Sequence, residues 1–163
     1  MLLRGIPIPA GQTGHAAGRS LLAQLYREYT GEEKLPPIRI GERGKPCFEG
    51  NKVFFSVSHT HRYVFCAVAS VNIGIDAEEL DRQVSPRLAE KILSQTEYAQ
   101  YQQAEDQNRA LLTFWVLKEA AGKCTGEGIN GYPNHTAFSL EDPRVTEQNG
   151  CLLAVVREDD HAL

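Results

Sequence analysis

Residues 72–80 read N-I-G-I-D-A-E-E-L, an apolar strand that runs directly into three carboxylates. Residues i and i+2 of a strand face the same way, so we expect Asp76 and Glu78 to project together and Glu79 to face away into solvent. Two carboxylates at that spacing repel each other unless one is protonated or a cation lies between them. Mg²⁺ prefers hard oxygen ligands and combines carboxylates with water and phosphate oxygens. The stretch therefore raises the hypothesis of a magnesium site at the end of a buried strand.

Strand-like segments lie on both sides of this stretch. Residues 53–58 and 63–69 are rich in β-branched and aromatic side chains, which favour strands. Because the connections are short, we expect these two segments and Ile73–Ala77 to form an antiparallel meander. Further along the chain, residues 137–140 and 151–156 are predicted to be short strands that pair with each other.

Three helical regions accompany the strands. Leucines and tyrosines recur at helical spacing over residues 15–29 and predict an amphipathic helix. Residues 84–104 are predicted to form a helix in two pieces, the second of which begins with a capping-box sequence at 94–97. Residues 107–124 carry apolar side chains nearly all the way round, so we expect this helix to be mostly buried. These segments indicate an α+β fold in which antiparallel strands pack on helices.

The composition is that of an ordinary globular protein, with 42% hydrophobic and 23% charged residues in a chain of 163. That length suits one compact domain or two small lobes that share a core. The sequence has no apolar run of about 18 residues, as a membrane span requires, and its start is too short and proline-rich for a signal peptide. The four cysteines form no C-x-x-C pair and are expected to be reduced. We therefore expect a cytoplasmic protein without a membrane partner.

Charge is distributed unevenly along the chain. Residues 1–73 contain nine Lys/Arg and five Asp/Glu, whereas residues 74–163 contain eight Lys/Arg and sixteen Asp/Glu. A basic first half suits an anionic ligand and an acidic second half suits a cation; chance clustering on solvated surfaces is the alternative. The basic half has no dense Lys/Arg patch with interleaved aromatic residues, so we expect no nucleic-acid partner.

Glu119 is an unexpected charge within the apolar helix predicted over residues 107–124. A carboxylate on a buried face is costly unless it is paired or coordinated. Lys123 lies four residues further on the same helical stripe and could be the partner. A metal ion is the other candidate, if the helix lies against the strand that carries Asp76 and Glu78. The alternative is that Glu119 pairs only with Lys123 and that the two strand carboxylates cap the next segment.

Two histidines and a lysine loop are further candidates. His59 and His61 have the i, i+2 spacing of a zinc site only if their strand continues, and the segment resembles a turn. Contact of His59 with a phosphate or hydroxyl group, or a plain surface position, are the other interpretations. The turn Gly44-Lys45-Pro46 would hold an ammonium against a phosphate, or is an exposed turn. The sequence matches no P-loop, dinucleotide fingerprint or nucleophile elbow.

Taken in order, these segments resemble the 4'-phosphopantetheinyl transferases of the larger, surfactin-synthetase-activating type, in a shortened form. The resemblance extends over about residues 15–156, and the matching segments are G-K-P at 44–46, F-S-V-S-H at 55–59, G-I-D-A-E at 74–78 and W-V-L-K-E at 115–119. It implies two unequal, pseudo-symmetric lobes, residues 1–72 and residues 73–163, with the active site between them.

The resemblance also implies an activity, namely Mg²⁺-dependent transfer of 4'-phosphopantetheine from coenzyme A to a serine of an acyl or peptidyl carrier protein. It makes Asp76, Glu78 and Glu119 the metal ligands. Glu119 is the implied base for the serine, and Lys123 lies by the pyrophosphate and assists the leaving group. We expect the metal and Lys123 to lower the pKa of Glu119.

The same resemblance places the adenine nucleotide beside Lys45 and Pro46, and the 3'-phosphate region beside Ser58 and His59. The implied coenzyme A contacts are Lys45, Pro46, Ser58, His59, Asp76 and Lys123. Two differences from the family stand out. The first lobe lacks about its opening third, so the expected phosphate-binding lysines and arginine have only Arg19 as a counterpart. The second lobe is short between Leu140 and Cys151.

A docking surface and two competing functions complete these expectations. The loop Thr125–Pro133 is the candidate surface for a carrier protein. One competing function is a non-catalytic relative that binds coenzyme A or a carrier protein. The other is a Mg²⁺-dependent phosphoryl or pyrophosphate hydrolase that uses the same carboxylates.

Overall fold

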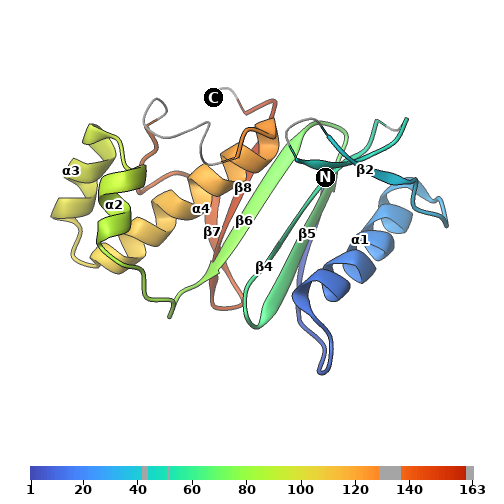
Figure 1. Ribbon diagram of the computed structural model, residues 1–163, viewed down its shortest axis with the longest axis horizontal. Coiled ribbons are helices and arrows are strands. Elements are labelled where there is room, and N and C mark those ends of the chain that lie inside the picture. Colours follow the sequence, from blue (N-terminus) through green and yellow to red (C-terminus); the bar gives the residue numbers. More distant parts are fainter. Residues whose placement is uncertain (42–43, 51, 129–136, 161–163) are drawn as a thin grey trace.

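The computed structural model describes residues 1–41, 44–50, 52–128 and 137–160. It contains two three-stranded antiparallel sheets side by side, each covered by a long helix (Figure 1). The first sheet has the order β1-β5-β4, and the second has the order β6-β8-β7. The strands are β1 (Leu2–Pro7), β4 (Phe54–His59), β5 (Tyr63–Ala69), β6 (Ile73–Glu79), β7 (Val145–Gln148) and β8 (Cys151–Arg157). The predicted α+β class with antiparallel strands is confirmed.

The helix of the first sheet is α1, Gly14–Thr30. Thr13 caps its start by accepting a hydrogen bond from the amide of Ala16 at 3.1 Å, and Gly31 ends it in the left-handed conformation that suits glycine. The helix packs on β4 and β5 through one apolar face, which includes Leu21, Leu22, Leu25 and Tyr26. Its other face is exposed, so the amphipathic helix predicted over residues 15–29 is confirmed.

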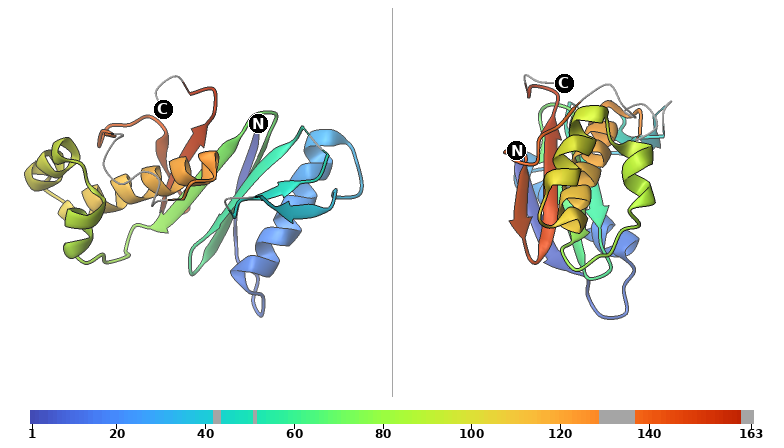
Figure 2. Two further views of the ribbon diagram at one scale, coloured as in Figure 1. Left: turned by 45° about the horizontal axis from the view of Figure 1, so that its top comes forward. Right: turned by 90° about the vertical axis from the view of Figure 1, so that its left-hand side faces the viewer.

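The helix of the second sheet is α4, Gln107–Thr125, and it is buried on nearly all sides, as predicted. It packs on β6 and β8, while α2 (Arg87–Ile92) and α3 (Gln95–Gln103) lie near its N-terminal half (Figure 2). Its close approach to β6 depends on Gly74, where an added Cβ would overlap the helix backbone at Ala120. Any larger residue there would push the helix away from the strand.

A buried ion pair fixes α3 against α4. The predicted capping box is present, since Ser94 accepts the amide of Glu97 at 3.2 Å and Glu97 accepts the amide of Ser94 at 2.7 Å. The Glu97 carboxylate also lies 2.9 Å from Lys118 Nζ of α4, and both side chains are fully buried. Its other oxygen accepts the amide of Phe138 at 2.9 Å. One carboxylate thus joins two helices and the segment before β7.

The seam between the two sheets is formed by side chains. The predicted antiparallel pairing of β4 with β5 is confirmed. β6 lies next to β4 (Figure 1) and pairs with β8, not with β5, so the third strand of the predicted meander is wrong. The Ser56 and Ser58 hydroxyls of β4 accept the backbone amides of Ile75 at 3.0 Å and Ala77 at 3.2 Å. Two hydroxyl groups therefore take the place of a backbone ladder at this edge.

The strand pair at the end of the chain also differs from the prediction. Residues 137–140 form no strand, and β8 pairs instead with β7, in a register that places Gln148 opposite Cys151. Asn149 and Gly150 connect the two strands with positive φ angles of 55° and 72°. Asn-Gly is the preferred sequence for such a two-residue hairpin turn.

The remaining elements are small. β2 (Ile38–Ile40) and β3 (Pro46–Phe48) form a separate two-stranded ribbon. All four cysteines are free thiols, and burial raises the pKa of the Cys66 thiol to about 12. None of the helices within the described residues has the length and apolarity needed to span a membrane. The predicted division into lobes 1–72 and 73–163 falls between β5 and β6; this division and the pseudo-symmetry stay predictions.

Candidate functional site

The candidate site lies where α4 crosses β6. Asp76 is buried on β6, and its Oδ1 accepts hydrogen bonds from Lys123 Nζ at 2.6 Å and from the Ser58 hydroxyl at 2.9 Å. Lys123 Nζ is also 3.5 Å from Ser58 Oγ. One carboxylate oxygen therefore gathers side chains from β4, β6 and α4, which are far apart in the sequence.

The second oxygen of Asp76 differs from the first. Asp76 Oδ2 is buried and accepts no hydrogen bond from the residues that the structure describes. A buried carboxylate oxygen without a donor is costly, and such atoms usually mark a place for water, an ion or a ligand. This atom fits a cation that is bound together with a ligand.

Glu119 of α4 is half-buried and belongs electrostatically to the same group. Burial raises its pKa, the nearby carboxylates of Asp76 and Glu78 raise it further, and Lys123 lowers it. Lys123 lowers the pKa of Glu119, as expected. The pKa nevertheless lies above the ordinary glutamate value, whereas we expected the metal and Lys123 together to lower it. Lys123 forms its ion pair with Asp76. The carboxylates of Asp76 and Glu78 thus destabilise the charge of Glu119, and a cation between these groups would relieve the repulsion.

Glu78 also acts on Glu119, but the Glu78 carboxylate already accepts hydrogen bonds from other side chains. Its Oε1 accepts hydrogen bonds from Arg82 and, at 3.2 Å, from the indole Nε1 of Trp115. Within the described residues, no three His, Cys, Asp or Glu side chains are grouped closely enough to hold a metal without rearrangement. Asp76 and Glu119 therefore fit a cation best, and Glu78 could join them after it separates from Arg82.

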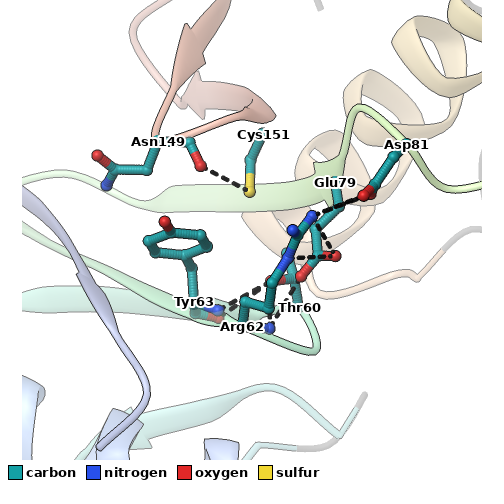
Figure 3. Close-up of polar contacts among 7 residues, drawn as sticks. All are labelled: Thr60, Arg62, Tyr63, Glu79, Asp81, Asn149 and Cys151. Atoms are coloured by element: carbon teal, nitrogen blue, oxygen red, sulfur yellow. Dashed lines mark hydrogen bonds and ion pairs between the residues drawn. The ribbon is translucent and has the colours of Figure 1, made fainter.

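Glu79 does not face solvent as expected. Its side chain is only 13% exposed, and it accepts the backbone amide of Arg62 at 2.8 Å and the Arg62 Nε at 3.0 Å. The same guanidinium binds Asp81 (Figure 3). This contact fastens the β4–β5 turn to the end of β6, which is a structural role that the sequence pattern did not indicate.

A cavity of about 260 Å³ is lined both by Lys123 and by the Gly44-Lys45-Pro46 turn. Its lining residues include Gly44, Lys45, Pro46, Phe55, Val57, Gly122 and Lys123. The G-K-P turn and the lysine at the end of α4 are therefore brought to one cavity. The Lys45 ammonium is nevertheless engaged with the protein itself, because it donates to Asn72 Oδ1 at 3.0 Å, to Ile73 O at 3.2 Å and to Cys124 O at 2.9 Å.

Ser58 and His59 lie at the end of β4 but differ in exposure. The Ser58 hydroxyl is buried and directed to Asp76. His59 is exposed, and its ring lies against Gly14 so closely that an added Cβ there would be 2.7 Å from the ring. His61 is also exposed. Of the predicted docking loop Thr125–Pro133, residues 129–133 lie outside the described part of the chain.

Comparison with known proteins gives a consistent result. A family model described as the 4'-phosphopantetheinyl transferase superfamily matches residues 72–158. The chain is 32% identical over 122 residues to 4'-phosphopantetheinyl transferase gsp of Aneurinibacillus migulanus, covering 69% of this chain and 50% of that protein. It is 34% identical to 4'-phosphopantetheinyl transferase Sfp of Bacillus subtilis, covering 65% of this chain and 48% of the relative.

A second kind of relative matches a shorter part. The chain is 40% identical over 78 residues to a holo-[acyl-carrier-protein] synthase of Photorhabdus laumondii, covering 44% of this chain and 60% of that protein. The chain spans about half the length of gsp and Sfp. The family match includes β6 and α4, and hence Asp76, Glu119 and Lys123.

Proposed function

Because the chain belongs to the 4'-phosphopantetheinyl transferase superfamily, we propose that it transfers 4'-phosphopantetheine from coenzyme A to a serine hydroxyl of an acyl or peptidyl carrier protein. The proposal rests chiefly on one observation, which is that Asp76 and Glu119 interact with Lys123, a residue that lines a cavity. A carboxylate with a raised pKa beside a lysine suits proton transfer next to a phosphate.

The chemical step that we propose is a displacement at the phosphorus atom next to pantetheine. The serine oxygen forms a bond to this phosphorus, and the bond to the bridging oxygen of the pyrophosphate breaks. Glu119 takes the serine proton, directly or through water, and the departing adenosine bisphosphate carries the negative charge that develops. Lys123 stabilises that charge, since an ammonium near the leaving oxygen lowers the energy of the transition state.

Asp76 and Glu119 would hold Mg²⁺, together with Glu78 once it leaves Arg82. When bound, Mg²⁺ supplies positive charge that offsets the charge of the pyrophosphate. The unpartnered Asp76 Oδ2 supports this assignment. Ser58 contributes by donating to the other oxygen, which fixes the orientation of the carboxylate.

The coenzyme A contacts remain those that the motifs suggest. We propose that the nucleotide lies along the cavity wall formed by Pro46 and the methylene groups of Lys45, with His59 near the 3'-phosphate. Four free thiols are consistent with a reducing compartment, so we place the protein in the cytoplasm.

A mass measurement tests the proposal. The protein is incubated with coenzyme A, Mg²⁺ and an apo-carrier protein, and the carrier is expected to gain the mass of one phosphopantetheine. Binding of coenzyme A without any mass gain would instead identify a non-catalytic relative. Phosphate release in the absence of a carrier would identify a hydrolase. Incubation with EDTA is expected to stop the transfer.

A further inference from the structure

Lys45 lies where three parts of the molecule meet. Its Nζ donates to the side chain of Asn72, to the carbonyl of Ile73 at the start of β6, and to the carbonyl of Cys124 in the last turn of α4, at 2.9 to 3.2 Å. An ammonium has three protons to donate. All of them are used within the protein, so none is left for a phosphate.

The contact to Cys124 acts on the end of α4. The last carbonyls of a helix have no partner within the helix, and a cation there offsets both the unpaired groups and the helix dipole. The neighbouring Cys124 thiol is also 3.5 Å from the Asn72 carbonyl. At the same place, Gly74 lets the backbones of β6 and α4 touch. Lys45 therefore adds hydrogen bonds at the place where the two backbones touch.

The environment of Lys45 differs from that of a ligand-binding lysine. The side chain is half-buried, and burial lowers the pKa of its ammonium. Its three hydrogen-bond acceptors are neutral oxygens. Lys123, in contrast, holds a carboxylate with its ammonium at the cavity. The two lysines on the cavity wall thus have different tasks.

We propose that Lys45 is a positioning residue, whose ammonium fixes the end of α4 on the start of β6 and so holds Lys123 at Asp76. Cys124 follows Lys123 directly in the helix, so a shift of the last turn displaces the Lys123 ammonium from Asp76. The contact with α4 is a property of the free protein. Its effect on Lys123 during catalysis rests on the proposed function.

Hydrogen exchange of the free protein tests the contact. We expect Lys45→Met to speed amide exchange in the last turn of α4, residues 121–125, by about ten-fold, because buried carbonyls lose a charged donor. Exchange in α1 is expected to stay unchanged and shows that the fold is intact. Lys34→Met, at an exposed lysine, serves as the matched control. Unchanged exchange in residues 121–125 of Lys45→Met overturns the proposal.

Global unfolding of Lys45→Met would call for a second variant. Lys45→Arg keeps a cation with several donors but changes its length and shape. Exchange at the end of α4 that is faster than in wild type, with α1 unchanged, supports the proposal. Wild-type exchange at this end overturns it, because the contact would then not depend on the fit of the ammonium.

Transfer kinetics separate positioning from phosphate binding. A positioning role predicts that Lys45→Met lowers kcat by about ten-fold and leaves the KM for coenzyme A within about two-fold. A rise in KM with normal kcat and normal exchange identifies a phosphate ligand and overturns the proposal. Faster exchange with normal kcat overturns the link to Lys123. If the wild-type protein transfers nothing, the proposed function fails, while the exchange experiment still decides the contact.

Discussion

The two long helices differ although each lies on a three-stranded antiparallel sheet. α1 buries one apolar face on β4 and β5 and exposes the other, whereas α4 is covered on nearly every side. All candidate catalytic groups that come from a helix lie on α4. Partial burial raises the pKa of Glu119 there, while Glu28 of α1 is exposed and is bound by the Arg4 guanidinium. Because both helices lie on the same kind of sheet, the comparison indicates that burial, which removes water from a carboxylate, is what perturbs its pKa.

The largest expected effect comes from Glu119→Gln. We expect transfer to fall by about 10³-fold or more, because the amide cannot accept the serine proton. The fold should persist, since glutamine has nearly the same shape. Glu28→Gln makes the same change on α1 and should leave the rate unaltered. Mass spectrometry of the carrier protein measures both variants, and near-normal transfer by Glu119→Gln would remove this residue from the mechanism.

A methyl group at a glycine tests how each helix contacts its sheet. In Gly74→Ala the new Cβ meets the backbone of α4 and forces the helix away from β6, and we expect the free energy of unfolding to fall by about 3 kcal/mol. In Gly18→Ala on α1 the new Cβ meets two side chains, Val57 at 2.9 Å and Val64 at 3.5 Å, and no backbone. Alanine also favours the helix, so a change within about 1 kcal/mol is expected. Urea unfolding measures both, and equal losses would contradict the difference between the helices.

Trp115 on α4 provides a smaller test, since it is the only tryptophan of the chain and donates to Glu78. Trp115→Phe removes this donor, and we expect Mg²⁺ affinity to weaken by about ten-fold, as for other residues that orient a metal ligand. Isothermal titration calorimetry measures the affinity. Tyr26→Phe removes a hydroxyl from α1 and should not change it. Trp115 emission of the wild-type protein should respond to Mg²⁺; a flat titration would contradict metal binding at Glu78.

The smallest effect is expected in the pH dependence of stability. The folded metal-free protein holds a proton on Glu119 more tightly than the unfolded chain, because its pKa is raised. The free energy of unfolding should therefore fall as pH rises from about 4.5, the ordinary glutamate value, through the raised pKa. Glu119→Gln should lack this decrease. Urea unfolding at several pH values in EDTA measures the difference, and parallel curves would exclude a raised pKa.

Local signals in the sequence predicted most of the helices and several strands. The apolar stripe of α1, the capping box at Ser94 and the all-round apolar surface of α4 each depend on neighbours in the chain, and each is found in the structure. β1 gave a weak signal because it ends in prolines, which an edge strand tolerates. β7 is short and polar, although the Asn149-Gly150 turn would have revealed it.

The errors arose where side chains replace backbone pairing. The apolar segment 137–140 resembles a strand, but the amide of Phe138 is satisfied by Glu97, and its ring packs beneath Lys118 and Arg144. The third strand of the meander was wrong because periodicity shows which segments are strands and not which strands pair. β6 finds its partner β8 from a distant part of the chain.

The sequence named the candidate residues, whose roles stay predictions, but it did not indicate their contacts with one another. Helical spacing suggested Lys123 as a partner of Glu119, because it reports only neighbours along one helix. The ion pair between Lys123 and Asp76 depends on how closely α4 approaches β6, and therefore on Gly74. The buried position of the Ser58 hydroxyl likewise follows from the arrangement of two sheets.

The hydrogen bonds of Ser56 and Ser58 between the two sheets also determine how the sheets align. The Ser58 hydroxyl accepts the amide of Ala77 and donates to Asp76 at once. If β4 slid by one residue along β6, Val57 would stand in its place and both bonds would vanish together. Correct alignment of the two sheets is therefore a condition for an oriented Asp76, on which the proposed transfer depends.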